Sequence, residues 1–263
     1  MKNRKPSFCD KTSFSLAMAG VSRAVVLKET ESTNDVAKEM LKNGCRDFAT
    51  VVAERQTKGK GRSGKSFYSP DETGAYVSVA LHASDDKKPY VTAIAALATA
   101  RTVEEFSGSP AFIKWVNDVY LFDKKVAGIL AERVISESVT GEVIGIGTNL
   151  QDPDDGFPDD IKDVAGSLNL LVDKRAEYIG ALVKNLRDEY ENFDKKSALK
   201  TFREKSYLTG KDVNVRDLFG TYKARVLDID DDFGLVVMKE DGVSVLRSGV
   251  VSISVIRLSL IHI

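Results

Sequence analysis

The chain has 263 residues, of which 43% are hydrophobic and 29% are charged. These proportions are close to the globular average and exclude a fibrous or largely disordered chain. With 38 basic and 39 acidic residues, the formal charge is -1, so no overall positive field attracts the protein to nucleic acid or to an anionic membrane. An anion site must therefore be a local cluster of cations.

The two cysteines, Cys9 and Cys45, form no C-x-x-C pair, and both histidines lie far from them in the sequence. Neither a disulfide framework nor a zinc site is indicated, which fits a reducing cytoplasm. The apolar run at 14–21 is short and interrupted by Ser15 and Gly20, so it is a poor signal peptide. No stretch reaches the ~18 apolar residues of a membrane helix. We expect a cytoplasmic protein with no membrane partner.

In the first half of the chain, the hydrophobic pattern alternates between helical and strand periods. Ser32 or Thr33 can cap a helix that Gly44 ends. The stretch 56–74 is rich in glycine, lysine and arginine and fits neither period, so it predicts a long basic loop. The other predicted elements are a strand at 49–54, a strand at 75–82, a helix at 91–106, a hairpin of 112–122 and 125–134 that turns near 123–124, and a strand at 142–150.

The second half begins with an acidic stretch at 152–163, which we expect to be a solvated loop. Hydrophobic residues at three- and four-residue spacing predict a helix at about 175–193, and a shorter helix follows around Leu199 and Phe202. After Gly210, short alternating segments separated by turn residues predict a compact β-barrel. The pattern indicates an α+β fold with a small C-terminal β domain.

The basic loop alternates glycines with cations in the segment Gly59-Lys60-Gly61-Arg62-Ser63-Gly64-Lys65. Backbone N–H groups can approach an anion there while the side chains neutralise it, which favours a phosphate or a carboxylate. Residues 59–66 fit the spelling G-x-x-x-x-G-K-[S/T], but a P-loop leads directly into a helix and the next element predicted here is the strand at 75–82, so the loop is not a P-loop. A flexible solvated loop is the alternative interpretation.

The segment IKWVNDV carries two opposite charges close together. In an extended strand, the period of two places Lys114, Val116 and Asp118 on one face and Trp115 and Asn117 on the other. The charges then project together. A surface ion pair on a half-buried strand explains them without a ligand.

Two further segments allow either a ligand or ordinary packing. Gly145 and Gly147 alternate in a predicted strand, which suggests close approach of a ligand or of another backbone. Ser32, Thr33 and Asn34 offer three compact hydrogen-bonding side chains at a helix start, where capping explains one or two of them.

Taken together, these segments closely resemble the biotin–protein ligases. The order and approximate spacing match from about residue 25 to 150, and the remainder is similar in layout, ending in the family's small SH3-like barrel. The KW-x-ND and K-x-AGIL pair with the basic glycine loop is highly specific, whereas the C-terminal similarity is only architectural. The matching segments are EST-N at 31–34, AERQTKGKGRSGK at 53–65, KWVNDV at 114–119 with KKVAGILAE at 124–132, and GIGTNL at 145–150.

The resemblance implies a mixed β-sheet with flanking helices, of the biotin/lipoate ligase and class II synthetase-like type. It divides the chain into an N-terminal extension at 1–24, a catalytic biotin- and ATP-binding domain at 25–208 and an SH3-like domain at 209–263. The implied enzyme is an ATP-dependent, AMP-forming biotin–[acetyl-CoA-carboxylase] ligase of the monofunctional type. The biotin carboxylate attacks the α-phosphate of ATP, and a lysine of a biotin carboxyl carrier domain then attacks biotinyl-AMP.

The resemblance also assigns roles to residues. The ureido ring of biotin needs donors and acceptors around an apolar bicycle, and Gln56 and the 31–34 segment supply both kinds. Repulsion between the carboxylate and the triphosphate requires fixed positive charge together with Mg²⁺ that arrives with ATP, and no metal ligand from the protein is predicted. The expected biotin-binding residues are Ser32, Thr33, Asn34, Gln56, Lys60, Gly61, Arg62 and Lys125, and the nucleotide-binding residues are Gly59, Lys60, Gly61, Arg62, Lys65, Phe67, Asn117 and Asn149.

Four residues are expected to be catalytic, namely Arg62, Lys114, Asp118 and Lys125. The resemblance places Lys125 near the biotin carboxylate and Arg62 at the carboxyl–phosphate junction of the intermediate. The attacking lysine of the carrier has a reference pKa of ~10.4 and is mostly protonated at pH 7, so a base or an anionic guide is useful. Asp118 is the candidate for that role.

Several positions depart from the family pattern. Val116 stands where KWPND has its proline. Lys60, Ser63 and Lys65 replace three arginines of GRGRRGR, which reduces bidentate contacts to phosphate. Phe67 must serve where a tryptophan often packs on adenine. The sequence leaves the effect of these changes on ATP affinity open.

Other functions remain as alternatives, namely a lipoate–protein ligase-like enzyme and a non-catalytic biotin- or adenylate-binding regulator. Some biotin ligases are also repressors with an N-terminal helix-turn-helix domain. Here about 30 residues precede Ser32, too few for that module, so no specific DNA binding is expected. The sequence leaves open a homodimer and the role of the apolar tail LSLIHI at 258–263.

Overall fold

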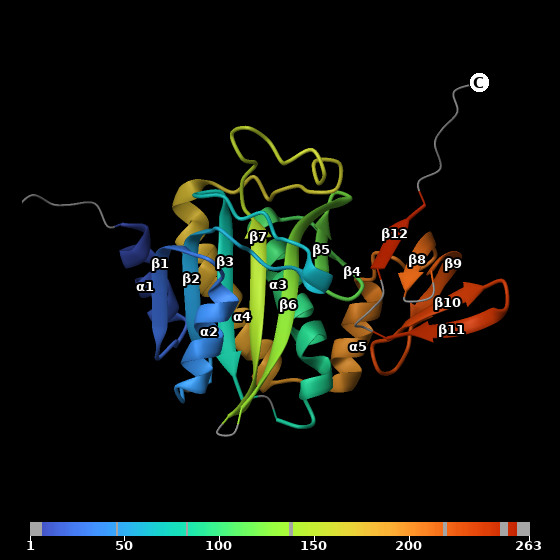
Figure 1. The fold of residues 1–263 in the computed structure, drawn as a ribbon, viewed down its shortest axis with the longest axis horizontal. Helices are drawn as coiled ribbons and strands as arrows, with labels where there is room; N and C mark the ends of the chain where they lie inside the picture. Colours follow the sequence, from blue (N-terminus) through green and yellow to red (C-terminus); the bar gives the residue numbers. More distant parts are fainter. Residues whose placement is uncertain are drawn as a thin grey trace, which may run out of the picture.

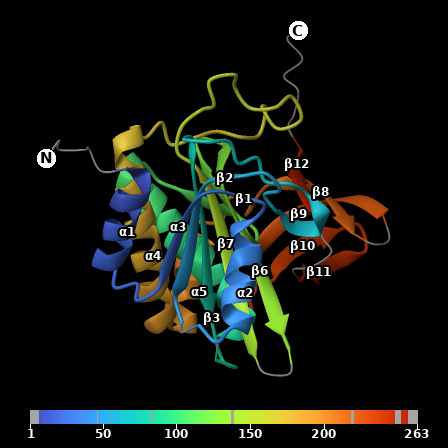
Figure 2. The same cartoon turned by 60° about the vertical axis from the view of Figure 1, so that its left-hand side comes forward.

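The computed structural model describes residues 7–45, 47–82, 84–136, 139–217, 220–247 and 252–256. A seven-stranded mixed sheet carries helices on both faces, and a five-stranded antiparallel sheet lies beside one end of it (Figure 1). Helix α2 covers one face of the large sheet, and α3 and α4 cover the other, with α1 beside α4 (Figure 2). The implied α+β fold is confirmed.

The large sheet has the order β1-β2-β3-β7-β6-β5-β4. Only β1 and β2 are parallel neighbours, and the other pairs are antiparallel. Every residue of β3 is buried, because helices lie over both faces of the sheet centre. The strands are β1 (Ala24–Thr30), β2 (Ala49–Gln56), β3 (Gly74–Leu81), β4 (Phe112–Lys114), β5 (Asp118–Leu121), β6 (Lys124–Ile135) and β7 (Thr140–Asn149).

The helices predicted from the hydrophobic spacing are all present, with ends that differ by one or two residues. They are α2 (Thr33–Lys42), α3 (Val91–Ser107), α4 (Arg175–Glu191) and α5 (Lys195–Glu204). The pattern missed α1 (Phe8–Met18), where Thr12 and Leu16 are the buried residues. It also missed β1, whose residues are exposed or half-buried because β1 is an edge strand.

The prediction of one strand over 112–122 is wrong. The strand β4 ends at Lys114, residues 115–117 turn back, and β5 starts at Asp118, so Lys114 and Asp118 are direct cross-strand partners. We call residues 115–117 the Trp115 turn. The alternation that we inferred along this segment does not apply, but the two charges are neighbours across the hairpin. The predicted turn near 123–124 is confirmed between β5 and β6.

The C-terminal sheet has the order β11-β10-β9-β8-β12. Within the residues that the structure describes it is an open sheet, so the predicted closed barrel is not formed: β11 and β12 lie at opposite edges. The tail 258–263 lies outside the described residues. The strands are β8 (Asp212–Asp217), β9 (Gly220–Ile229), β10 (Leu235–Lys239), β11 (Gly242–Leu246) and β12 (Ser252–Val255).

One cluster of buried apolar side chains extends from the helices through the large sheet into the C-terminal sheet, and it includes Leu182, Val79, Trp115 and Phe233. A smaller cluster lies beneath α2. The C-terminal sheet thus packs on the same core as the helices. None of the helices in the described part of the chain combines the length and apolar character needed to cross a membrane.

Helix α1 packs closely on α4. It begins with a capping box in which Ser7 and Asp10 exchange side-chain hydrogen bonds with each other's backbone N–H. A Cβ at Gly180 of α4 would lie 2.9 Å from the Ser15 carbonyl oxygen, so the glycine allows the two helices to approach. Leu16 is fully buried between them and the sheet.

We predict that Leu16→Ala lowers the free energy of unfolding by about 2–5 kcal/mol, because it removes a buried side chain and leaves a cavity. Urea denaturation measures the change. Met18, on the same helix, is 74% exposed, and Met18→Ala should change stability by less than about 0.5 kcal/mol. Equal effects of the two substitutions would contradict the packing of α1.

Candidate functional site

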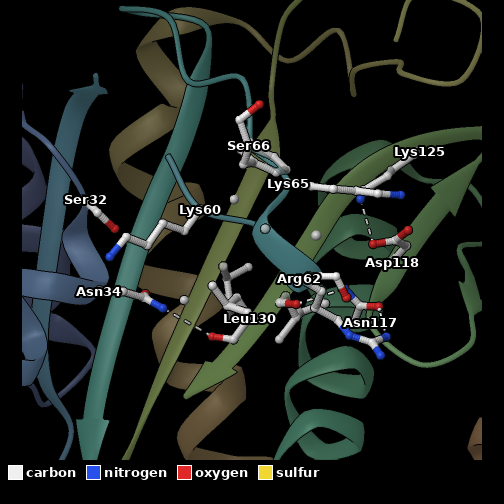
Figure 3. A pocket seen from close by; sticks show the side chains of 18 of the residues that line it. Ser32, Asn34, Lys60, Arg62, Lys65, Ser66, Asn117, Asp118, Lys125 and Leu130 are labelled. Carbon is white, nitrogen blue, oxygen red and sulfur yellow. Dashed lines mark hydrogen bonds and ion pairs between the residues drawn. The ribbon is translucent and has the colours of Figure 1, made fainter. Parts of the chain in front are cut away.

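A pocket lies between the loop at 59–67, which we call the glycine loop, and the face of β6 and β7 (Figure 3). The pocket brings together all the residues predicted for the site except Gly59 and Asn149. The predicted residues that line it are Ser32, Thr33, Asn34, Gln56, Lys60, Gly61, Arg62, Lys65, Phe67, Lys114, Asn117, Asp118 and Lys125. Hydrogen-bonding groups at the start of α2 and a cationic group around Arg62 and Lys125 occupy opposite ends (Figure 3).

The glycine loop is folded by its own backbone. The N–H of Gly61 donates to the Lys65 carbonyl at 2.7 Å, and the N–H of Phe67 donates to the Gly59 carbonyl at 2.9 Å. A Cβ at Gly59 would collide with the Phe67 carbonyl and lie 2.6 Å from Ser69 Oγ. Gly59 therefore permits the close approach of the two ends of the loop, although it does not line the pocket.

At the α2 end, a network of neutral side chains replaces the predicted helix cap. Ser32 is the N-cap residue, but its side chain makes no capping hydrogen bond. The backbone N–H and the hydroxyl of Thr33 lie 2.8 and 3.0 Å from Gln56 Oε1, and Gln56 Nε2 donates to Ser69 Oγ at 3.0 Å. Side chains on α2, on β2 and just after the glycine loop are thereby linked.

Ser78 of β3 lies beneath this network, and the motifs did not point to it. It is fully buried, and its Oγ lies 2.6 Å from Asn34 Oδ1 and 2.7 Å from Thr33 Oγ1. An amide oxygen can only accept, so the Ser78 hydroxyl donates to Asn34 and can only accept from Thr33. A single polar residue within the apolar run AYVSVAL is the signal that sequence reasoning could have used.

Charged residues surround the same end. Asn34 Nδ2 donates to Glu132 Oε2 at 2.8 Å, and Lys38 Nζ lies 2.7 Å from Glu132 Oε1. Asp35 of α2 accepts from Lys60 Nζ at 2.6 Å, which ties α2 to the glycine loop. Burial by itself would raise the pKa of Asp35, but the hydrogen bond from Lys60 and the charges of Lys60 and Lys38 outweigh it and lower the pKa.

At the opposite end, cations and the Trp115 turn meet. Lys125 Nζ lies 2.7 Å from Asp118 Oδ1, and Arg62 Nη1 donates to Asn117 Oδ1 at 2.9 Å. Lys114 Nζ donates to Tyr120 Oη at 3.3 Å. Burial lowers the pKa of Arg62, and the charge of Asp118 opposes that shift. A guanidinium nevertheless stays charged in proteins, so this end presents fixed positive charge.

Asn149 lies outside the pocket lining, although we expected it at the nucleotide. Its Nδ2 donates to the Gly166 carbonyl at 2.9 Å. The segment around Gly166 pairs with the backbone of Lys125, whose N–H donates to the Val164 carbonyl at 2.8 Å. Asn149 therefore contacts the loop that holds the Lys125 backbone.

The two glycines of β7 make room for side chains on the pocket floor. A Cβ at Gly145 would collide with Asn34 Oδ1, and one at Gly147 would lie 2.5 Å from the Phe67 ring. The alternating glycines do permit a close approach, but the groups that approach are the side chains of Asn34 and Phe67 rather than the ligand or backbone that we expected. Ile253 of β12 also lines the pocket, which no motif indicated.

In the part of the chain that the structure describes, no group of three or more His, Cys, Asp or Glu residues could hold a metal ion. Asp118 is the one carboxylate among the described lining residues. A divalent cation at this site would therefore take most of its ligands from a bound phosphate and from water.

Fold and pocket together define a protein that holds a small molecule between a basic glycine loop and a mixed sheet. The model of the biotin/lipoate A/B protein ligase family matches residues 26–149. The bifunctional ligase/repressor BirA of Bacillus subtilis is 32% identical over 227 residues, which cover 82% of this chain and 70% of that protein. The chain belongs to the biotin/lipoate A/B protein ligase family and, within it, to the biotin–protein ligases.

Two further similar proteins are also biotin–protein ligases. The biotin–[acetyl-CoA-carboxylase] ligase of Mycobacterium tuberculosis is 30% identical over 151 residues, which cover 54% of this chain and 55% of that protein. The structure of the biotin protein ligase from Aquifex aeolicus in complex with biotin and ATP has a TM-score of 0.74 and 27% identity, and the match covers 89% of this chain and 99% of that one.

We predict that Ser78→Ala lowers the free energy of unfolding by about 1–3 kcal/mol, because buried Asn34 Oδ1 loses its hydroxyl donor. Urea denaturation measures the loss. Ser66→Ala at the exposed rim of the same pocket is the matched control and should change stability by less than about 0.5 kcal/mol. If Ser78→Ala is as stable as the control, the hydrogen bond to Asn34 contributes nothing.

Proposed function

We propose that this chain activates biotin with ATP to form biotinyl-AMP and then transfers the biotinyl group to a lysine of a biotin carboxyl carrier domain. The observation that carries the proposal is the two-ended pocket: neutral donors and acceptors at the start of α2 face a group of cations across the glycine loop. A neutral ureido ring with a distant carboxylate is complementary to such a site. We propose in addition that the carrier domain belongs to acetyl-CoA carboxylase.

The ureido ring binds at the α2 end in this proposal. Ser32, Thr33, Asn34 and Gln56 all line that end of the pocket, and the hydroxyls can donate or accept. The network described above supports this role, because Glu132 can only accept and therefore holds Asn34 Nδ2, which leaves Asn34 Oδ1 to accept the hydrogen bond from Ser78. A site whose polar groups have fixed directions discriminates strongly against ligands that lack matching groups.

The first chemical step takes place at the cationic end. A carboxylate oxygen of biotin attacks the α-phosphorus of ATP, the new bond joins the two groups, and the bond to the pyrophosphate oxygen breaks. Lys125 and Arg62 lie where they can hold the carboxylate and the α-phosphate together, and Lys60, Lys65 and Lys114 add positive charge. Mg²⁺ enters with the triphosphate and offsets its charge.

The second step needs an uncharged amine. The carrier lysine arrives protonated and must lose a proton before it attacks the mixed anhydride. The Asp118 carboxylate attracts the ammonium group into the site and accepts the proton, and AMP leaves with the bonding electrons. Asp118 pairs with the ammonium group of Lys125 at 2.7 Å in the pocket lining. In this proposal the ammonium group of the carrier lysine takes the place of Lys125 beside Asp118.

In this proposal, residues 25–208 form the catalytic domain that binds biotin and ATP, and residues 209–263 form the C-terminal domain. The near-neutral charge and the free cysteines Cys9 and Cys45 support a cytoplasmic enzyme.

The deciding experiment is ATP-dependent transfer of labelled biotin to a carrier domain, with labelled lipoate in parallel. We expect transfer of biotin, formation of AMP and no transfer of lipoate. Lys125→Ala should abolish transfer, because it removes the cation next to Asp118, whereas Lys162→Ala, an exposed lysine paired with Asp159, should retain it. Transfer of lipoate alone would reassign the enzyme, and absence of any transfer at saturating substrates would refute the ligase.

We predict that Arg62→Lys slows single-turnover formation of biotinyl-AMP by about 10- to 100-fold. Lysine keeps the charge but cannot hold two oxygens in a fixed fork. Quenched-flow measurement of pyrophosphate release gives the rate. Lys58→Arg, an exposed exchange outside this pocket, next to Glu31 at 2.7 Å, is the control and should leave the rate unchanged. An Arg62→Lys rate within twofold of wild type would contradict the role of the fork.

A further inference from the structure

We propose that residues 230–234 of the C-terminal sheet, the Phe233 turn, position the Trp115 turn for adenylation through a hydrogen bond from the Trp115 indole to the Phe233 carbonyl. The inference rests on the proposed function, because the Trp115 turn lies between Lys114, which is assigned to adenylation, and Asp118, which is assigned to transfer. It makes the C-terminal sheet a part of the active-site scaffold, with Asp230 as a positioning residue far from the substrates.

The hydrogen bond is buried and joins distant parts of the chain. Trp115 Nε1 donates to the Phe233 carbonyl at 2.8 Å, and Trp115 is 5% exposed. An indole N–H in such a place must find an acceptor, because an unpaired buried donor is costly. Trp115 itself lines the pocket, directly after Lys114 and two residues before Asn117.

The two halves of the Trp115 turn are held by different sheets. On its C-terminal side, the Asn117 carbonyl accepts from the Ile129 N–H at 2.8 Å and Asn117 Nδ2 donates to the Ile129 carbonyl at 3.0 Å, so β6 fixes this half. On its N-terminal side, the Trp115 indole reaches the C-terminal sheet. The relative position of Lys114 and Asn117 therefore depends on both sheets.

The Phe233 turn is built to hold its carbonyl in one direction. Phe233 has a φ of 60°, in the left-handed region that is uncommon for a residue with a large side chain. Asp230 Oδ1 stabilises this conformation by accepting from the N–H groups of Asp232 and Gly234 at 2.9 and 2.7 Å. Arg247 at the end of β11 lies 2.6 Å from Asp230 Oδ2 and holds the carboxylate in place.

The side chain of Phe233 anchors the same turn to the helices of the large sheet. Its ring lies 5.4 Å from that of Phe202 on α5 and 5.6 Å from that of Tyr90 before α3, measured between centroids. Tyr90 also stacks on Phe193 at 5.4 Å. The carbonyl that receives the indole N–H is thus fixed by an aromatic cluster on one side and by Asp230 on the other.

The α2 end of the pocket does not depend on this contact. Its network runs through Thr33, Asn34, Gln56 and Ser78. Loosening the Phe233 turn should therefore slow the chemical step at the cationic end and leave biotin binding unchanged. Such a split distinguishes positioning from a general loss of structure.

The test uses Asp230→Ala, with Asp241→Ala as the matched control. Asp241 lies in the next turn of the same sheet, is 77% exposed at its side chain and pairs only with Lys239 among the described ion pairs. Trp115 is the only tryptophan of the chain, so the tryptophan emission of the ligand-free protein reports on the environment of this one side chain. We expect Asp230→Ala to shift the emission to longer wavelength and to slow biotinyl-AMP formation by about tenfold, with the biotin Kd within twofold of wild type.

Trp115→Phe, which keeps a ring but removes the donor, should slow the same step. If both substitutions act through one hydrogen bond, adding Asp230→Ala to Trp115→Phe causes little further loss. Asp230→Asn retains an oxygen that accepts from the two backbone N–H groups and should restore most of the rate. If Asp230→Ala does not fold, Arg247→Met removes the same ion pair from the exposed side.

Three results would overturn the inference: an Asp230→Ala enzyme indistinguishable from Asp241→Ala, a shifted emission with an unchanged adenylation rate, or fully additive losses in the double variant. A wild-type protein that forms no biotinyl-AMP refutes the proposed function and with it the catalytic part of this inference. In that case the emission shift still decides whether the Phe233 turn holds Trp115, so the two failures are distinguishable.

Discussion

The pocket depends on a patch of the central sheet that lacks side chains. Gly145 and Gly147 of β7 leave the space that Asn34 and the Phe67 ring occupy, and Gly128 of β6 is the cross-strand partner of Gly147. Ser78 is the cross-strand partner of Gly145, so its hydroxyl lies beside the space that the glycine leaves. Without this bare patch, α2 and the glycine loop could not approach the same face of the sheet.

A second constraint is electrostatic. The chain as a whole is nearly neutral, yet the pocket gathers cations that would repel one another if they were alone. Two carboxylates offset them, since Asp35 pairs with Lys60 on the α2 side and Asp118 pairs with Lys125 on the other. These pairs are partly exposed, so each contributes little to stability. Their effect is to hold flexible lysine side chains in place until an anionic ligand competes for them.

The sequence predicted those parts of the fold that local periodicity determines. Helices α2 to α5 and the central strands have strong apolar periods, because one or both of their faces are buried. The helix α1 buries little more than Thr12 and Leu16, and β1 is a half-exposed edge, so neither leaves a clear period. The sequence predicts a strand through the Trp115 turn because Val116 and its neighbours have high β-propensity, which tertiary contacts override. Closure of the C-terminal strands is a long-range property that alternation does not encode.

For the site, motif positions located the cations and the start of α2, because their chemistry is specified by residue type. What the motifs could not provide is which partner each side chain contacts. Asn149 carries a motif position but bonds to the Gly166 carbonyl, and Ser78 carries none but lies beneath the pocket. Such hydrogen-bond partners depend on how strands and loops that are distant in the sequence pack together, and neighbouring residues do not reveal them.

The arrangement of the two sheets suits the acyl-adenylate chemistry that we propose. Bringing a carboxylate to a triphosphate requires cations fixed before the reaction, because reorganising them during the step would consume the energy they supply. A three-residue turn between two short strands has too few contacts of its own to hold Lys114 and Asn117 rigidly. The shared core that contains both Trp115 and Phe233 supplies the missing constraint, because a close-packed interior transmits position from one sheet to the other.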